Sequence, residues 1–176
     1  MKTLLTLAAL CLPLCASAER ADRYEKTVIT YDGDMTHDTI KGISHFNDNV
    51  VLTKGSLRIA SDTLVVSESP DGSHTYIVTG LPGHVAKFKQ KLDSPDDKWI
   101  DGEGKVITYR EKEDDLTIDG NAMVKVSEHG NVSEEANSAS IIYDVRTEQF
   151  FAKSANNTTK VRSMLTISPR KDPLSK

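Results

Sequence analysis

The sequence predicts an all-β protein with almost no helix. Apolar residues recur at every second position, as in Val50 and Leu52 or Tyr76 and Val78, which places them on one face of a strand. These runs are short and rich in β-branched side chains, which favour strands. Turn-forming pairs separate them, at Asp32-Gly33, Lys54-Gly55, Pro82-Gly83, Asp119-Gly120 and His129-Gly130. Short strands at this spacing are typical of a meander, a sandwich or a barrel.

The first 18 residues have the pattern of a secretory signal peptide. Lys2 supplies the positive start, residues 4–14 form an apolar run, and Ala16-Ser17-Ala18 matches a cleavage site. The apolar run is shorter than the roughly 20 residues that a spanning helix needs. We therefore expect cleavage after Ala18 and export of the mature chain.

The cysteines and the charge distribution limit what the mature chain can do. Cys11 and Cys15 both lie within the expected signal peptide, so the mature chain would form no disulfide and no thiolate metal site. We expect one β domain over residues 19–165 and a basic, disordered tail over residues 166–176. From residue 153 onward there are six basic residues and one acidic residue, whereas the rest of the chain is acidic. An acidic body argues against binding to nucleic acid.

Two parts of the sequence resemble each other. Val28-Ile29-Thr30-Tyr31 recurs as Val106-Ile107-Thr108-Tyr109, and the strand that begins at Asn49 is echoed by the one that begins at Asn121. The order of these segments is the same in both halves, which indicates a two-fold duplication. Stacked β repeats bury their apolar faces against their neighbours and leave the terminal strands as exposed edges.

No pattern in the chain indicates catalysis. The five histidines lack metal-ligand spacing, and there is neither a Gly-x-Ser-x-Gly elbow nor a glycine loop for phosphate. The acidic segments 94–97 and 111–115 are interpreted as hydrated loops or hairpin tips. We expect no catalytic residue, no metal and no cofactor. The apolar strand faces remain as the candidate functional feature, either as a groove that receives alkyl chains or as a closed core.

The segment from Asn49 to Val66, Asn-Val-Val-Leu-Thr-Lys-Gly-Ser-Leu-Arg-Ile-Ala-Ser-Asp-Thr-Leu-Val-Val, resembles the OstA-like (LptA) family of periplasmic lipopolysaccharide transport proteins. Asp48 stands where that family usually has a glycine, whereas Gly120 keeps it in the second half. The resemblance implies an incomplete, twisted antiparallel β-jelly roll, V-shaped in section. It also implies that lipopolysaccharide is held by the acyl chains of its lipid A moiety.

The same resemblance implies partners and a location. The chain would act in the periplasm between an LptC-like inner-membrane partner and an LptD-like outer-membrane partner, and copies would associate head to tail by strand addition. The cleavable signal and the end of the chain at Lys176 fit the soluble middle component.

Strand parity selects the residues that would line the groove. They are Val28, Val50, Leu52, Leu57, Ile59, Leu64, Val66, Tyr109, Leu116, Ile118, Val124 and Val126. Around Val28 and Tyr109 the parity stays open, because both faces are partly apolar and a slip of one residue exchanges them. Two other functions remain as alternatives, a secreted jelly-roll module or enzyme for carbohydrate and a structural β-repeat filament protein.

Overall fold

The computed structural model describes residues 22, 24–153 and 163–168. The expected signal peptide and most of the expected basic tail lie outside these residues. The described part contains no α-helix and twelve strands, which are β1 Thr27–Thr30, β2 Met35–Asp38, β3 Ile43–Lys54, β4 Leu57–Glu68, β5 His74–Thr79, β6 Ala86–Lys91, β7 Lys98–Gly104, β8 Val106–Arg110, β9 Asp115–Glu128, β10 Asn131–Asp144, β11 Gln149–Lys153 and β12 Met164–Ile167.

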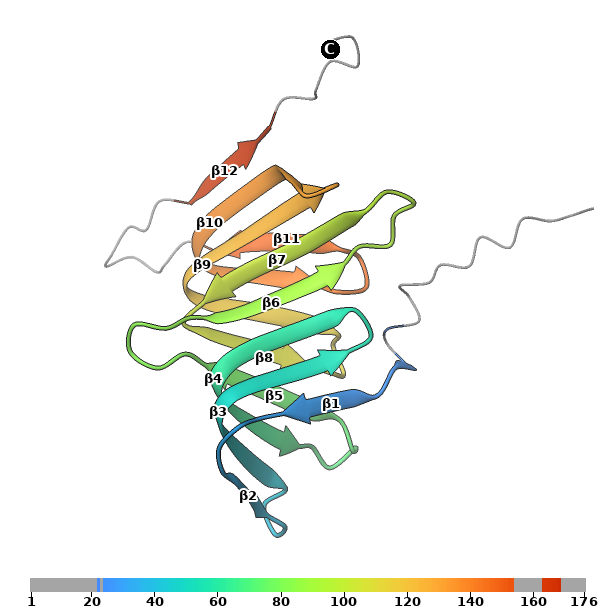
Figure 1. The fold of residues 1–176 in the computed structure, drawn as a ribbon. Helices are drawn as coiled ribbons and strands as arrows, with labels where there is room; N and C mark the ends of the chain where they lie inside the picture. The colour runs from blue at the N-terminus through green and yellow to red at the C-terminus, as the bar shows by residue number, and fades with distance from the viewer. Residues whose placement is uncertain (1–21, 23, 154–162, 169–176) are drawn as a thin grey trace, which may run out of the picture.

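The strands form two antiparallel layers, and four long strands belong to both. In one layer the order is β2-β3-β4-β5-β8-β9-β10-β11, and we call it the β5 layer. In the other, the β6 layer, the order is β1-β3-β4-β6-β7-β9-β10-β12. Strands β3, β4, β9 and β10 bend in the middle and carry the chain from one layer to the other (Figure 1). The prediction of an all-β, incomplete jelly roll is confirmed.

The bends lie at interruptions of the strand pairing. In β3 the register shifts between Asn47 and Val50, and the two residues between them, Asp48 and Asn49, have φ angles of 62° and 49°. In β9 the corresponding residues are Gly120 and Asn121, with φ angles of 81° and 58°. A pair of left-handed residues turns the strand out of one layer and into the other. Asp48 can replace the family's glycine because aspartate is among the residues that tolerate this conformation.

The structure contains a repeat of six strands, with β1–β6 equivalent to β7–β12. In the first unit, β1 and β2 pair with the two halves of β3, and in the second unit β7 and β8 pair with the two halves of β9. The predicted duplication is therefore present, but the match of the two Val-Ile-Thr-Tyr segments was wrong. The first lies on β1 in the β6 layer, whereas the second lies on β8 in the β5 layer. The counterpart of β8 is β2, because Met35 faces Phe46 as Ile107 faces Ile118.

The mispairing has a simple physical reason. A run of alternating β-branched and aromatic residues fits any half-buried strand, so four such residues do not specify a position within a repeat. Other predictions from local sequence are confirmed, since both acidic segments lie at hairpin tips, between β6 and β7 and between β8 and β9. The last strand, β12, ends at Ile167, slightly beyond the limit of 165 expected for the β domain.

Each end of the stack exposes two strand edges. Strands β1 and β2 lie at the lower end of Figure 1, and β11 and β12 lie toward the upper end. Among the described strands, each of these four pairs with one neighbour, so its other edge keeps open backbone N–H and C=O groups. The expectation that terminal strands are edges is thereby confirmed.

Candidate functional site

The inward faces of the two layers meet in one apolar interior. Of the twelve residues predicted to line a groove, ten are buried there, namely Val50, Leu52, Leu57, Ile59, Leu64, Val66, Tyr109, Leu116, Ile118 and Val124. Val126 is partly buried and packs against this cluster. The period-two pattern therefore identified the inward face of each half of β3, β4 and β9. The alternation keeps its phase through the bend in β3 and β9, whereas in β4 it shifts by one residue between Ile59 and Leu64.

Val28 lies on the other face. It is 50% exposed, whereas its neighbour Ile29 packs against the interior. The sequence left open which face of this strand points inward. In the structure, Ile29 occupies the inward position. Ile29 pairs with Leu52 across β1 and β3, and side chains of directly paired residues share one face.

The interior also contains residues that the prediction did not include. They come largely from β5, β6, β7 and β10, and they are Phe46, Tyr76, Val78, Ala86, Phe88, Ile100, Ile107, Ala122, Ala136, Ile141 and Tyr143. Alternation could have found several of them, as in Ala86 and Phe88 on β6. Tyr143 was harder to find, because the segment before it, Ile141-Ile142, is apolar on both faces of the strand.

Side chains from the two layers fill the interior. Leu52, Leu64, Leu116 and Ile118 are fully buried, and the rings of Tyr76 and Tyr109 stack with centroids 5.7 Å apart. Burial, reinforced by the nearby Asp114 and Glu111, raises the pKa of Tyr109, so its hydroxyl stays protonated and donates to Asp114 Oδ1 at 3.3 Å. Of the two alternatives that the sequence left open, the interior has the packing of a closed core.

The side of the molecule away from the bends is here called the mouth. It is formed by the hairpin turns of both layers, which follow Asp38, Lys54, Glu68, Lys91, Arg110, Glu128 and Asp144. The layers are continuous through the backbone at the bends, whereas at the mouth side chains connect them. The fold therefore has a fixed side and a side that side-chain contacts hold closed.

A three-residue contact spans the mouth near β1. Lys54, at the end of β3 in the β6 layer, is buried, and its Nζ lies 3.0 Å from Oε1 of Glu111 in the β5 layer. The His74 backbone N–H donates to Oε2 of Glu111 at 3.2 Å, and the His74 ring Nδ1 lies 3.1 Å from the same oxygen. Burial disfavours the charged Glu111, but the hydrogen bonds from Lys54 and His74 outweigh it and lower the pKa of Glu111.

Beside this contact is a shallow hollow of about 380 Å³, where the interior reaches the surface. Apolar side chains of Ile29, Phe46, Val66 and Tyr76 line it together with polar groups. Thr27 and Ile29 of the end strand β1 form part of its lining, so the hollow gives access to this end of the interior.

Among the described residues, no three His, Cys, Asp or Glu side chains lie close enough together to hold a metal ion. Trp99, near the start of β7, donates from its Nε1 to Asp97 at 2.8 Å, and the Lys89 ammonium lies 4.6 Å from the centroid of its ring. No helix in the described part of the chain has the length and apolar character needed to cross a membrane.

Comparisons with known proteins agree with this architecture. The crystal structure of LptH from Pseudomonas aeruginosa, described as the LptA-homologous periplasmic component of the lipopolysaccharide transport device, superposes with a TM-score of 0.71. The two sequences are 22% identical, and the match covers 85% of this chain and 99% of that one. The likeness shows that the two proteins share a fold.

Sequence comparison gives a relative and a family. Lipopolysaccharide export system protein LptA of Haemophilus influenzae is 26% identical over 162 residues, which are 92% of this chain and 90% of that protein. The family described as LptA/(LptD N-terminal domain) LPS transport protein matches residues 23–149. This match spans both six-strand units up to the start of β11, and the chain therefore belongs to the LptA/LptD N-terminal domain family of lipopolysaccharide transport proteins.

Proposed function

We propose that this chain is a non-catalytic periplasmic carrier that shelters the acyl chains of lipopolysaccharide between its two layers. One observation carries the proposal: the apolar interior lies between sheets that the backbone joins along one side only. Each methylene group removed from water contributes about 0.8 kcal/mol, so an interior that admits acyl chains could hold a lipid firmly. Family membership and the LptA relative support the same function.

Because the interior is packed, acyl chains have to part the layers at the mouth. This movement breaks side-chain contacts such as Lys54–Glu111 and leaves the bends in place. The layers are antiparallel hairpins whose own pairing stays intact, so each moves as a unit. Lipid contacts with Leu52, Ile59, Leu116 and Ile118 then replace contacts between these side chains.

Locking the mouth tests this proposal. Lys54→Cys and Glu111→Cys, joined by a short, cleavable, thiol-specific reagent, tie the two layers together in a mature chain expected to contain no other cysteine. The matched control is Ile77→Cys with Thr108→Cys, which are paired within the β5 layer and leave the mouth unconstrained. We expect the mouth-locked protein to lose lipopolysaccharide binding, measured by mass spectrometry of co-purified lipid, and to regain it when the bridge is cleaved. Equal binding by the locked and control proteins would contradict entry through the mouth.

We further propose that copies of the chain associate head to tail and so bridge LptC-like and LptD-like partners. The junction between the two units inside the chain supplies the template. There, β5 pairs with β8 in one layer and β6 pairs with β7 in the other. The equivalents of β5 and β6 at the far end are β11 and β12, and those of β8 and β7 at the near end are β2 and β1. All four have an open edge.

The internal junction also predicts the register between copies. Val78 faces Ile107 across β5 and β8, and the corresponding residues are Ala152 on β11 and Met35 on β2. Phe88 faces Gly102 across β6 and β7, which corresponds to Leu165 on β12 and Ile29 on β1.

Cysteine cross-linking tests the register. A mixture of Ala152→Cys and Met35→Cys proteins should form a disulfide-linked dimer under mild oxidation. Phe151→Cys mixed with Met35→Cys serves as the matched control, because a shift of one residue places the two thiols on opposite faces of the sheet. Equal yields from the two mixtures, or no concentration-dependent assembly in light scattering, would contradict strand addition in this register.

A further inference from the structure

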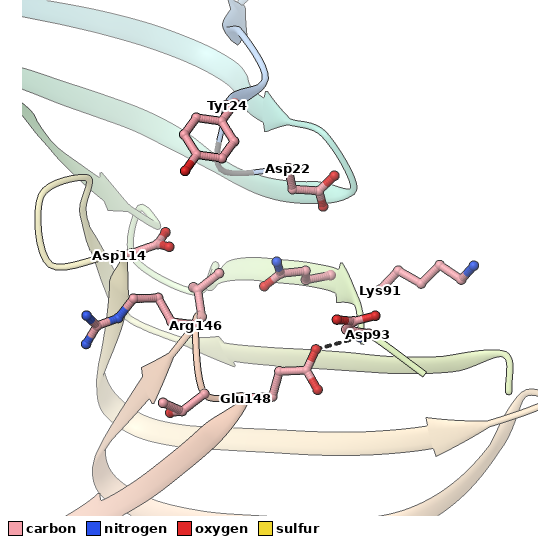
Figure 2. A pocket seen from close by; sticks show the side chains of 10 residues that line it. Asp22, Tyr24, Lys91, Asp93, Asp114, Arg146 and Glu148 are labelled. Carbon is pink, nitrogen blue, oxygen red and sulfur yellow. Dashed lines mark hydrogen bonds between the residues drawn. The ribbon is translucent and has the colours of Figure 1, made fainter. Parts of the chain in front are cut away.

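A second hollow lies at the mouth, with a different lining from the first. Its volume is about 610 Å³. One side is formed by the end of β6 and the residues that follow it, and the other by the turn between β10 and β11. Figure 2 shows the labelled side chains around it, with Lys91 and Asp93 on one side and Arg146 and Glu148 on the other. The Asp93 backbone N–H donates to Glu148 Oε1 at 2.5 Å, so this hollow also spans the two layers.

A buried polar side chain lines this hollow without a hydrogen-bond partner. Gln90 follows Ala86 and Phe88 on the inward face of β6, and it is 5% exposed. Its Oε1 accepts no hydrogen bond from any described residue. A buried amide oxygen without a partner in the chain is a ready acceptor for a donor that enters the hollow. Gln90 can thus accept a hydrogen bond from a ligand.

The neighbouring Tyr143 is a candidate hydrogen-bond donor. Its ring stacks on Phe88 with centroids 5.8 Å apart, which brings it beside the strand face that carries Gln90. The hydroxyl of Tyr143 is buried and has no hydrogen-bond partner among the described residues. Burial, together with the nearby carboxylates of Glu148, Asp114 and Asp144, raises its pKa, so it remains a donor. Gln90 therefore offers an acceptor in the lining of the hollow, and Tyr143 offers a donor in the apolar interior next to Phe88.

This arrangement selects a type of ligand. A hydroxyl or a secondary amide can donate to Gln90 and accept from Tyr143, whereas a phosphate or carboxylate offers acceptors only. The described lining contains four carboxylates, from Asp22, Asp93, Asp114 and Glu148, and two cations, from Lys91 and Arg146. Such an excess of negative charge disfavours an anionic group. The stacked rings of Phe88 and Tyr143 lie in the interior, and Phe88 is next to Gln90 on the inward face of β6.

We propose that this hollow binds the neutral head of an amphiphile, a hydroxylated or N-acylated sugar, whose alkyl chain continues between the layers past Phe88. The inference rests on the proposed function and deepens it. It assigns the sugar hydroxyl and amide groups of the glycolipid to Gln90 and Tyr143, and it places the phosphates outside this hollow. Gln90 and Tyr143 are thereby residues that select the head rather than the chain.

Three probes with the same alkyl chain test the assignment on the mature chain. They are decyl glucoside, decyl phosphate and decyl methyl ether, which has no hydrogen-bond donor, each used below its micelle concentration or solubility limit and titrated by calorimetry. We expect decyl glucoside to bind about tenfold more tightly than the other two, the difference that one hydrogen bond of ordinary strength makes. Gln90→Leu should remove this preference by weakening the binding of decyl glucoside. Lys87→Leu, on the outward face of the same strand, is the matched control and should keep the preference.

The outcomes separate this inference from the function on which it rests. If all three probes bind equally to the wild type, or if Gln90→Leu keeps the preference for glucoside, the head site is overturned while chain binding stands. If no decyl probe binds at all, both proposals fall. Tyr143→Phe keeps the ring stack and removes the hydroxyl, so it provides the same readout should Gln90→Leu fail to fold, and an unchanged preference in that variant would equally overturn the site.

Discussion

The two six-strand units solve the same steric problem in opposite ways. In the first unit the chain crosses between layers at Gly33 and faces Asp48, whereas in the second unit it crosses at Lys105 and faces Gly120. Both crossings use the same backbone contact, since Gly33 N–H donates to Asn47 O at 3.1 Å and Lys105 N–H donates to Asp119 O at 2.8 Å. In each unit one of the two facing residues is glycine. In the first unit it is Gly33 at the crossing, and in the second unit it is Gly120 in the bend of the long strand.

This exchange shows what the bend requires. A Cβ atom added at Gly33 would collide with the Asp48 side chain, and one added at Gly120 would lie 2.8 Å from the Cβ of Lys105. Each crossing therefore has room for one side chain, and either strand can supply it. The left-handed backbone itself does not require glycine, because Asp48 adopts it with a φ of 62°.

The units also differ in how deeply equivalent strands are buried. Ile107 on β8 is fully buried because β5 covers its far edge, whereas its counterpart Met35 on β2 is 47% exposed at the end of the stack. Equivalent positions should therefore respond very differently to substitution.

The largest expected effect concerns these two positions. Ile107→Ala should lower the free energy of unfolding by about 4 kcal/mol, because it leaves a cavity in a packed interior. Met35→Ala should change it by less than about 0.5 kcal/mol, as is usual for exposed sites. Urea denaturation of the monomer measures both values. Similar losses at the two positions would mean that β2 is covered in the isolated chain.

The crossing itself can be exchanged between units. Gly120→Asp gives the second unit the residue of the first and should cost about 2–3 kcal/mol, since overpacking a tight site forces its neighbours to shift. Adding Lys105→Gly should recover most of that loss, because it recreates the first unit's arrangement. A double-mutant cycle by denaturation measures the coupling. Additive losses in the double variant would refute the idea of a single shared space.

The mouth contact is expected to have an intermediate effect that depends on pH. Lys54 is buried, whereas its counterpart in the second unit, Val126, carries no charge. Glu111→Gln leaves this lysine without its carboxylate and should cost about 2 kcal/mol at pH 7. Because the pKa of Glu111 is lower in the folded protein, its contribution is present above the ordinary pKa of 4.5 and is lost as the pH falls through the lower folded pKa.

Denaturation at pH 7 and at pH 3 measures this dependence. The difference in stability between wild type and Glu111→Gln should shrink at the acid pH. Glu113→Gln, in the same turn, is the matched control and should show little difference at either pH. An equal difference at both pH values for Glu111→Gln would attribute the effect to packing rather than charge.

The smallest expected effect concerns the outward face of β1. Val28 is half exposed, and the equivalent position on β7 is the polar Asp101. Val28→Asp should therefore change stability by no more than about 0.5 kcal/mol and leave lipopolysaccharide binding intact. Thermal unfolding and lipid co-purification measure these quantities. Loss of lipid binding in a stable Val28→Asp protein would indicate that Val28 contacts the lipid, as the sequence predicted.

Local sequence patterns predicted the fold and much of the interior for a clear reason. Period-two alternation is a property of each strand alone, so Leu52, Ile59 and Leu116 could be placed without knowing their neighbours. The bends could not be predicted in this way. The runs on either side of Asn49 look like separate short strands, whereas the structure joins them into the twelve residues of β3.

Contacts between distant segments were also beyond local patterns. Lys54 and Glu111 are 57 residues apart, and nothing in either segment indicates that the other lies across the mouth. Gln90 could have been found in part, because it stands in phase with Ala86 and Phe88 on an otherwise apolar strand face. What alternation does not reveal is that its amide oxygen remains without a partner, since that depends on the turn after β10.

The repeated unit has a consequence for length. In the proposed head-to-tail assembly, each added copy would cover one pair of open edges and bring an equivalent pair, so the strand pairing itself would not limit the number of copies. Growth of the fibre would end where a different component pairs with the open strand edges and presents no further open edge. The length of such a fibre would then be set by the distance between the two components to which its ends are attached.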